Sequence, residues 1–300
     1  MQGFDLSTIS DCYIGNNQVS EIWLGQTKIW PTHDYSQDYL TIVSLEDNND
    51  IGWEGSGNNS MYKTISVSTD NGNNWAQYTS SSTSSTTGTI LATLNTGDKL
   101  LIKGNNNIYS DLMDYYNYFI SSGNFNIEGN IMSLIYGDNF IGQTTLPTVS
   151  SFTPSTFGNL FYACSNLISA KNLILPATTL TKYCYWCMFS LCTSLITPPE
   201  LPATTLADGC YGYMFEACNS LTTAPTLRPV TLTRQCYYQM FQGCILLNYI
   251  KCLATDLSAF ECLYNWVYGV ASSGTFVKAS SATWPSGVSG IPNNWVILNN

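Results

Sequence analysis

Apolar residues in the second half of the chain recur with a period of 26 residues. Five columns of equivalent positions keep this spacing through at least three copies. They are Cys184, Cys210, Cys236 and Cys262; Cys192, Cys218 and Cys244; Met188, Met214 and Met240; Phe189, Phe215 and Phe241; and Leu195, Leu221 and Leu247. An earlier copy with Phe161, Cys164 and Leu167 carries two extra residues. A fixed period of this length predicts stacked repeats, each burying its apolar face against the next copy.

Each repeat combines two patterns. In CYGYMFEAC (210–218), apolar residues at i, i+4 and i+8 would share one stripe of a helix, which predicts a short helix. The following NSLTTAPTL (219–227) is rich in threonine and interrupted by proline, which predicts an extended segment. A strand followed by a helix in about 26 residues is the unit of a leucine-rich-repeat solenoid.

The cysteines of these columns are expected to be packed, reduced thiols, because free cysteine behaves as a small hydrophobe. Disulfides between neighbouring copies are the alternative, since stacked equivalent residues lie about 5 Å apart. Zinc is disfavoured because Cys184 and Cys187 form a CxxC pair that no second pair completes. We expect ten residues to form the repeat core: Cys184, Cys192, Cys210, Met214, Phe215, Cys218, Cys236, Met240, Phe241 and Cys244.

Catalytic patterns are weak in this sequence. The only histidine, His33, lies in a Pro-Thr-His-Asp turn outside the repeats, so a cysteine or serine nucleophile lacks an evident base. Paired carboxylates would have to come from residues such as Glu46, Asp47, Glu54 or Asp70, which lie in or beside turn clusters. We therefore expect no enzymatic activity, no catalytic residues, no metal and no cofactor.

The sequence pattern in the first part of the chain predicts β-structure. Residues 11–31 contain two β-runs broken by glycine and polar residues, which predicts two tight hairpins. Residues 36–110 alternate with period two around turn clusters, which predicts a β-sandwich. The stretch STDNGNNW (68–75) resembles an Asp-box, a hairpin turn whose aspartate bonds the turn backbone while its tryptophan packs below.

Composition and charge exclude several functional classes. Only 10% of the residues are charged, against roughly 25% in typical domains. Residues 1–150 carry a net charge of −11 and residues 151–300 a net charge of +1, so binding to nucleic acid is not expected. The N-terminus shows no secretory signal, and no apolar run is long enough for membrane insertion.

The repeat also carries a family resemblance. Residues 160–270 resemble the BspA-type leucine-rich repeat, through MFSLC (188–192), MFEAC (214–218), MFQGC (240–244) and the LPATTL stretches at 175–180 and 201–206. The expected fold class is α+β multidomain, with an N-terminal β-hairpin module and β-sandwich followed by a BspA-like leucine-rich-repeat solenoid. The expected domains are an attachment module (1–35), a sandwich-like domain (36–124), the solenoid with its N-terminal cap (125–270) and a C-terminal cap (271–300).

The resemblance extends to virion proteins of gut Bacteroidales phages, including crAss-like phages. It implies a structural protein of the virion, in a tail or head fibre, assembled in the host cytoplasm. Other virion proteins and a host surface glycan or protein are the implied partners, and a homotrimer is the common state of fibres. Candidate ligand positions are Thr197, Glu200, Thr223, Thr226 and Tyr249. The alternatives are a bacterial cell-surface BspA-like adhesin, with its export signal outside this sequence, and a glycan depolymerase.

Overall fold

The computed structural model describes residues 12–14, 17–19, 22–24, 27–30, 34–56, 62–81, 89–111, 115–148 and 154–300. It divides the chain into two units, Met1–Tyr35 and Ser36–Asn300. The first unit contains two antiparallel hairpins in the segments where the sequence predicts them. Strand β1 (Cys12–Ile14) pairs with β2 (Asn17–Val19), and β3 (Ile22–Leu24) pairs with β4 (Thr27–Trp30). His33 lies outside the described residues.

The second unit opens with two sheets that share one hydrophobic core. The six-stranded sheet has the order β15-β13-β5-β10-β7-β8, and the five-stranded sheet has the order β14-β11-β12-β6-β9. Their strands are β5 (Leu40–Ser44), β6 (Asn49–Gly55), β7 (Thr64–Ser68), β8 (Ala76–Thr79), β9 (Thr89–Leu94), β10 (Lys99–Gly104), β11 (Ser110–Asp111), β12 (Tyr115–Ser121), β13 (Phe125–Asn130), β14 (Pro154–Ser155) and β15 (Leu167–Ile174). The short helical elements are η1 (Tyr35–Gln37), α1 (Ser133–Tyr136) and η3 (Gly137–Asn139).

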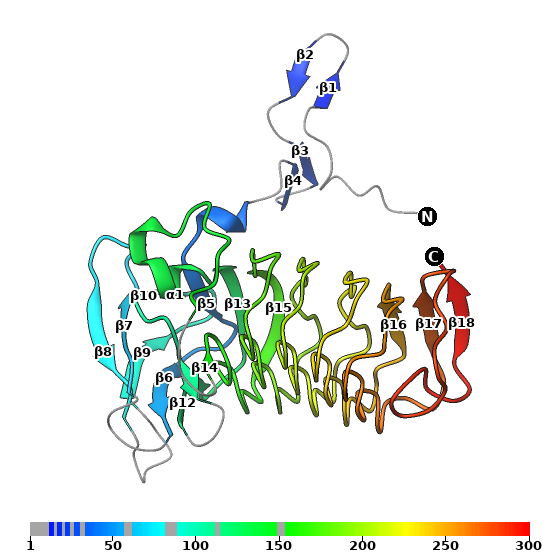
Figure 1. Ribbon diagram of the computed structural model, residues 1–300. Coiled ribbons are helices and arrows are strands. Elements are labelled where there is room, and N and C mark those ends of the chain that lie inside the picture. The colour runs from blue at the N-terminus through cyan, green and yellow to red at the C-terminus, as the bar shows by residue number, and fades with distance from the viewer. Residues whose placement is uncertain are drawn as a thin grey trace. The chain divides into compact units, whose positions relative to one another are not determined.

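Strand β13 connects the sheets to the repeats. It pairs antiparallel with β5 on one edge and parallel with β15 on the other. Because β15 belongs to the earliest copy of the repeat, this pairing places the repeats directly on the six-stranded sheet (Figure 1). The predicted boundary between 124 and 125 falls just before β13, and the division of the chain into the four expected domains stays a prediction.

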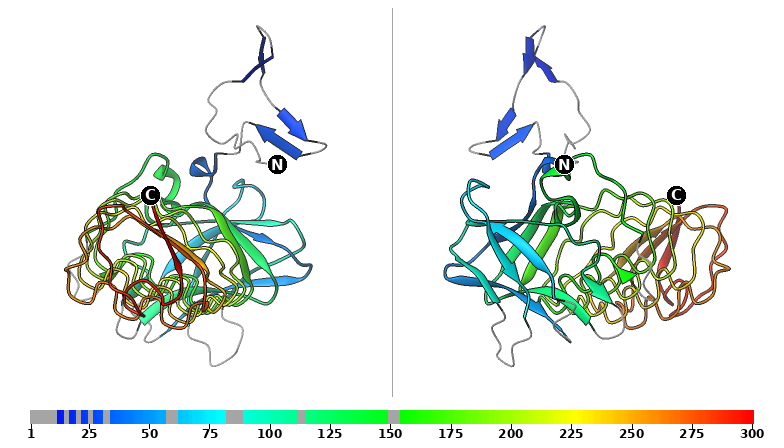
Figure 2. Two further views of the ribbon diagram at one scale, coloured as in Figure 1. Left: turned by 90° about the vertical axis from the view of Figure 1, so that its right-hand side faces the viewer. Right: turned by 60° about the vertical axis from the view of Figure 1, so that its left-hand side comes forward.

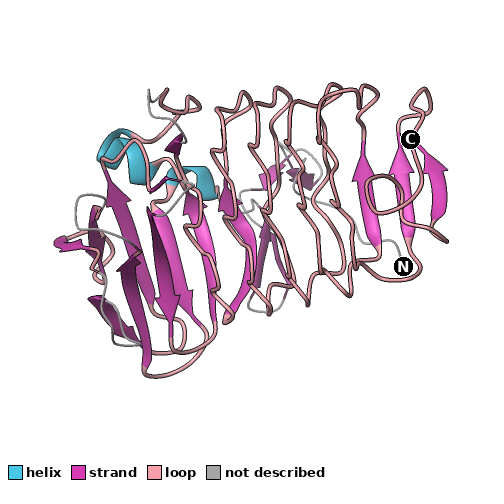
Figure 3. Cartoon of the chain, turned by 60° about the horizontal axis from the view of Figure 1, so that its bottom comes forward, coloured by secondary structure: helices cyan, strands magenta, loops and turns pink. Residues whose placement is uncertain are grey.

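The repeats follow one another side by side from β15 to the last strand of the chain (Figure 1). Seen along the stack, their coils lie over one another (Figure 2). The stack ends in a three-stranded parallel sheet of β16 (Tyr249–Cys252), β17 (Thr275–Lys278) and β18 (Val296–Asn299). Between β15 and β16 the coils are joined by single parallel bridges and isolated backbone hydrogen bonds, so Figure 3 draws this part mostly as loop.

The expectation of an α+β fold that ends in a leucine-rich-repeat solenoid is wrong. Within the described residues α1 is the only α-helix, and it lies outside the repeats. The segment 210–218, which the sequence predicts as a helix, is a run of tight turns. Its carbonyls at Tyr211 and Phe215 accept the N–H groups three residues later, at Met214 and Cys218. The fold is therefore β-rich.

The intervening residues of this run bond to the next repeat instead. Tyr213 donates its N–H to the carbonyl of Tyr238 at 2.8 Å, and Phe215 donates to Met240 at 2.9 Å. Gly209, Tyr213 and Ala217 all have positive φ, so every fourth residue of this run has a left-handed backbone conformation. Local turns and bonds to the neighbouring coil alternate residue by residue, and this pattern replaces a helix.

The five apolar columns build the core of the stack. All ten residues predicted for the repeat core have 0% exposure. The rings of Phe161, Phe189, Phe215 and Phe241 stack in sequence, with 5.6 to 5.7 Å between neighbouring centroids and near-parallel planes. This distance is close to the spacing of strands in a sheet, about 4.8 Å, because one coil follows the next at the pitch of backbone hydrogen bonding.

Residues 271–300 pack on the last repeat. The indole N–H of Trp284 donates to the carbonyl of Ala254 at 3.3 Å, and the indole N–H of Trp266 in the repeat donates to the carbonyl of Gly290 at 2.8 Å. The ring of Trp284 also stacks on Trp266, with 5.7 Å between centroids. None of the helices in the described part of the chain is long and apolar enough to cross a membrane.

Candidate functional site

One side of the repeat stack carries a row of extended segments. Ser169 bridges to Thr197, Thr223 bridges to Tyr249, and the row continues through β16, β17 and β18. Backbone bonds reinforce these contacts: Ala170 donates to Thr197 at 2.8 Å, and Ala224 donates to Tyr249 at 3.0 Å. We call this side the strand side, and the opposite side, with the run of turns, the turn side.

The row is interrupted once on the strand side. Among the described residues, no backbone hydrogen bond or bridge joins residues 196–200 to residues 222–226. On the turn side the same two repeats stay bonded, for example from Tyr211 to Cys236 at 3.1 Å. The two coils are also joined just before this interval, where Ser220 donates its N–H to the carbonyl of Thr193 at 3.1 Å, and they are unbonded over the interval itself.

Proline explains part of this interruption. Pro198 occupies the position that Ala170 holds in the previous copy and Ala224 in the next. Both alanines donate their N–H to the following coil, but proline has no N–H to donate. Pro199, and Pro225 at the equivalent position of the next copy, also lack an N–H.

A groove of about 520 Å³ lies over this interval. Its volume falls within the range of small-ligand sites, roughly 300–1,000 Å³. The groove gathers all five residues that the sequence analysis selects as candidate ligand positions. It is lined by Lys171, Ile196, Thr197, Pro198, Pro199, Glu200, Thr222, Thr223, Ala224, Pro225, Thr226 and Tyr249.

The proline and lysine residues of this groove are not among the five candidate ligand positions. Pro198 was available as a signal, because aligning the copies shows a proline where its neighbours have alanine. Lys171 belongs to the earliest copy, whose two extra residues obscure its position in the row. Only the structure places this lysine beside residues of the following repeats.

The groove has a polar, nearly uncharged lining. Four threonines and Tyr249 line it beside Pro198, which is half-buried, and Pro199 and Pro225, which are buried. The carboxylate of Glu200 lies 3.3 Å from the guanidinium of Arg228, an exposed ion pair. Lys171 is the remaining charged group of the lining, and it is exposed. Such a lining can donate and accept hydrogen bonds and contact an apolar ring face.

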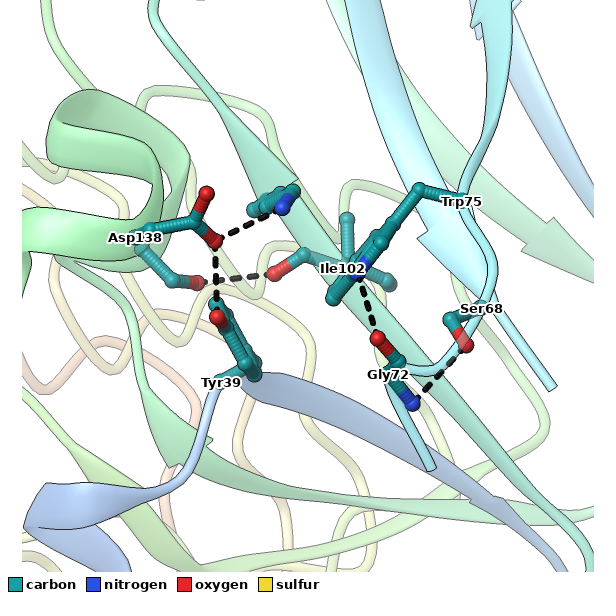
Figure 4. Close-up of polar contacts among 8 residues, drawn as sticks. Tyr39, Ser68, Gly72, Trp75, Ile102 and Asp138 are labelled. Atoms are coloured by element: carbon teal, nitrogen blue, oxygen red, sulfur yellow. Dashed lines mark hydrogen bonds and ion pairs between the residues drawn. The ribbon is translucent and has the colours of Figure 1, made fainter. Parts of the chain in front are cut away.

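The Asp-box-like turn is a separate, structural feature (Figure 4). The Asp70 carboxylate accepts the backbone N–H of Asn74 at 2.9 Å and its side-chain amide at 2.6 Å. These bonds hold the pKa of Asp70 at about 2. The indole N–H of Trp75 donates to the carbonyl of Gly72 at 3.0 Å. The predicted hairpin turn is confirmed, since β7 and β8 pair antiparallel on either side of it.

The face of Trp75 receives a cation. Lys103 places its ammonium 4.0 Å from the Trp75 ring centroid and 2.6 Å from the Asp138 carboxylate. The same carboxylate accepts the hydroxyl of Tyr39 at 2.7 Å, and Figure 4 shows these groups converging between the strands and α1. Each polar group of this cluster has its partner within the cluster, so it serves to fix the turn against the sheet.

The cysteines are unsuited to nucleophilic chemistry. The ten cysteines from Cys164 to Cys262 are free thiols, and nine of them are buried. Cys192, Cys218 and Cys244 each point the thiol at a backbone carbonyl of the preceding copy, at Phe161, Phe189 and Phe215, with distances of 2.9 to 3.1 Å. Burial raises the pKa of these thiols well above 9.0, whereas a nucleophilic thiolate needs a lowered pKa.

The other carboxylates named as glycosidase candidates are hydrogen-bonded to residues of neighbouring segments. Asp47 accepts the N–H and hydroxyl of Thr96, which lowers its pKa. Glu54 accepts the hydroxyl of Tyr118, and Glu46 accepts the amide of Asn124. Over the described part of the chain, no group of three or more histidine, cysteine, aspartate or glutamate side chains is placed to hold a metal ion.

The groove on the strand side is thus the site with the most developed geometry for binding. Comparison of the chain with protein-family models, with curated proteins and with solved structures finds no match.

Proposed function

We propose that this chain is a nonenzymatic structural protein of a bacteriophage virion, and that its repeat stack binds a molecule of the host surface. The observation that carries the binding part is the 520 Å³ groove, because it gathers all five candidate residues at one place. The virion part rests on the BspA-like motifs and on the two hairpins at the start of the chain.

The repeat stack suits such a role because it is a preorganised support. Each coil is fixed to its neighbour by backbone bonds on the turn side and by stacked aromatic rings in the core. A ligand that binds a rigid groove avoids the cost of ordering the loops around it. The groove residues belong to the strand-side segments, which are fixed to this support at both ends by the turn side of their own coil.

The two parts of the proposal are tested in one phage. Mass spectrometry of purified particles should find the chain in the virion. Particles carrying Thr197→Val, Thr223→Val and Tyr249→Phe together should assemble normally and adsorb to host cells several-fold more slowly. Particles with Thr204→Val are the matched control, because Thr204 is an exposed threonine of the same repeat outside the groove.

The variants are point substitutions for a structural reason. Deleting residues 151–300 would remove β14 and β15 from the two sheets of the second unit, so a loss of adsorption would not distinguish misfolding from lost binding. Detection of the chain on washed bacterial cells and not in particles would favour the adhesin. Release of reducing sugar from host capsule by the purified protein would favour the depolymerase.

A further inference from the structure

We propose that the ligand of the strand-side groove is a neutral glycan segment, seated in the interval that Pro198 leaves unbonded. This inference rests on the binding function proposed above and adds the chemical class of the ligand. Its first support is the floor of the groove. Among the described residues, the carbonyls of Ile196 and Thr223 accept no backbone hydrogen bond, and the N–H of Thr222 donates none.

The neighbouring copy shows what these groups do elsewhere in the row. The N–H of Asn248, equivalent to that of Thr222, donates to the preceding coil at 2.9 Å. The carbonyl of Tyr249, equivalent to that of Thr223, accepts the N–H of Ala224 at 3.0 Å. In the groove the same groups are left for another partner. These groups belong to exposed residues, so a ligand can reach them, and sugar hydroxyls can serve both as donors and as acceptors to them.

The walls favour a glycan over an extended peptide. A peptide that adds to a strand edge needs a regular series of N–H and carbonyl groups along that edge. Pro198 and Pro199 lack an N–H on one wall, and Pro225 lacks one on the other. The lining instead holds side chains that carry a hydroxyl, among them Thr197, Thr223, Thr226 and Tyr249.

The charge and the length of the groove restrict the class of ligand further. Glu200 is neutralised by Arg228, and Lys171 lies at the end of the groove that the earliest repeat contributes. The middle of the groove is therefore uncharged and suits neutral sugars. From Lys171 to Tyr249 the lining spans four successive copies, or three strand spacings of about 14 Å in all. This length matches a short oligosaccharide.

The test uses the full chain on an array of neutral tri- to pentasaccharides. Sialylated and uronic-acid-containing counterparts and a set of extended peptides are placed beside them. We expect binding to neutral oligosaccharides, followed by titration calorimetry with the best of them. Thr223→Val and Tyr249→Phe remove single hydroxyls with little change of shape, and each should weaken binding about tenfold, the loss expected for one hydrogen bond.

Two further variants examine the role of the proline. Pro198→Ala supplies the missing N–H opposite the carbonyl of Thr223 and should weaken binding at least about tenfold by closing the interval. Pro202→Ala is the control, because Pro202 is a half-buried proline of the same repeat outside the groove. Thr204→Val is the control for the threonine variant.

Three outcomes would overturn the inference. They are binding to peptides or acidic glycans alone, no binding to any neutral oligosaccharide, and neutral-glycan binding that the groove variants leave unchanged. Slower adsorption of the groove-variant particles together with any of these results would leave the proposed function standing with another ligand class. Neutral-glycan binding by the purified chain, without an effect on adsorption, would reject the host-recognition function and keep the glycan site.

Discussion

The indole of Trp186 lies over Gly212, in the space that a side chain at position 212 would fill. The two residues occupy equivalent positions in successive copies. Trp186 also contacts the ring of Tyr213 edge to face, with 5.0 Å between centroids, and lies near-parallel to Tyr238 at 6.4 Å. The glycine thus allows one large aromatic residue to reach across a whole repeat on the turn side.

Gly212→Ala should destabilise the protein through this contact. The added methyl group would overlap the indole, and overpacking of this kind costs about 1–3 kcal/mol. Unfolding in urea, followed by circular dichroism, measures the loss. In the double variant Gly212→Ala with Trp186→Ala the methyl group no longer meets the indole, so the combined cost should be smaller than the sum of the single costs. Simple additivity would contradict the contact.

Gly243→Ala should also destabilise the protein, for a different reason. The nearest atom to a methyl group at this position would be the Cα of Ala217 at 3.5 Å, an ordinary contact. The φ of Gly243 is 75°, however, and a left-handed backbone costs an L-residue roughly 1–2 kcal/mol. Ala217→Gly is the matched control, because Ala217 already has a φ of 54°. Equal losses in both variants would argue against backbone strain as the cause.

The buried thiols predict a loss of stability at alkaline pH. Burial raises the pKa of Cys192, Cys210 and Cys218 well above 9.0, so the folded protein keeps protons that the unfolded chain releases. The thiol contribution is complete below about pH 8 and declines as the pH rises through about 9, toward a slope of about 1.4 kcal/mol per pH unit for each thiol at higher pH. The free energy of unfolding in urea should fall by about 1.4 kcal/mol for each such thiol between about pH 8 and about pH 10, and Cys218→Ala should make this fall smaller.

The Asp70 carboxylate should make a smaller contribution to stability, which is lost at acid pH. Hydrogen bonds from Asn74 and Ser68 hold the pKa of Asp70 at about 2, below its ordinary 3.8. A lowered pKa contributes stability that is present above the ordinary value and is lost as the pH falls toward 2. Thermal unfolding of the protein and of Asp70→Asn should therefore differ most near neutral pH and converge near pH 2. A constant difference over this range would exclude the carboxylate as the source.

The columns of the repeat could be predicted from the sequence, but the local backbone could not. Positions such as Cys210, Met214 and Cys218 are four residues apart, and a helix with 3.6 residues per turn produces nearly the same spacing. Here the four-residue period comes from left-handed residues at Tyr213 and Ala217, which repeat the same turn. The burial of the columns is the same in both structures, so periodicity alone does not separate them.

The groove could be predicted in part. Its threonine and tyrosine residues follow from their non-core positions in the extended segments of the repeat. The interruption of the row could be inferred only at Pro198, and the pairing of β13 with β15 could not be inferred at all. That pairing joins Phe125 to Leu167, which lie far apart in the sequence. A local sequence pattern does not indicate which distant strand pairs with a given strand.

The alternation of turn bonds and bonds between coils makes the length of the stack adjustable in fixed steps. Every inter-coil bond of the turn run, such as that from Phe215 to Met240, joins equivalent faces of consecutive copies. Inserting one whole copy of 26 residues would preserve every column and move the far end outward by about 4.8 Å, one strand spacing. The two extra residues of the earliest copy do not lengthen the stack, because β15 takes them up as register shifts against β13 while Phe161 keeps its place on Phe189. The reach of the stack thus changes with the number of copies and not with the length of any one copy.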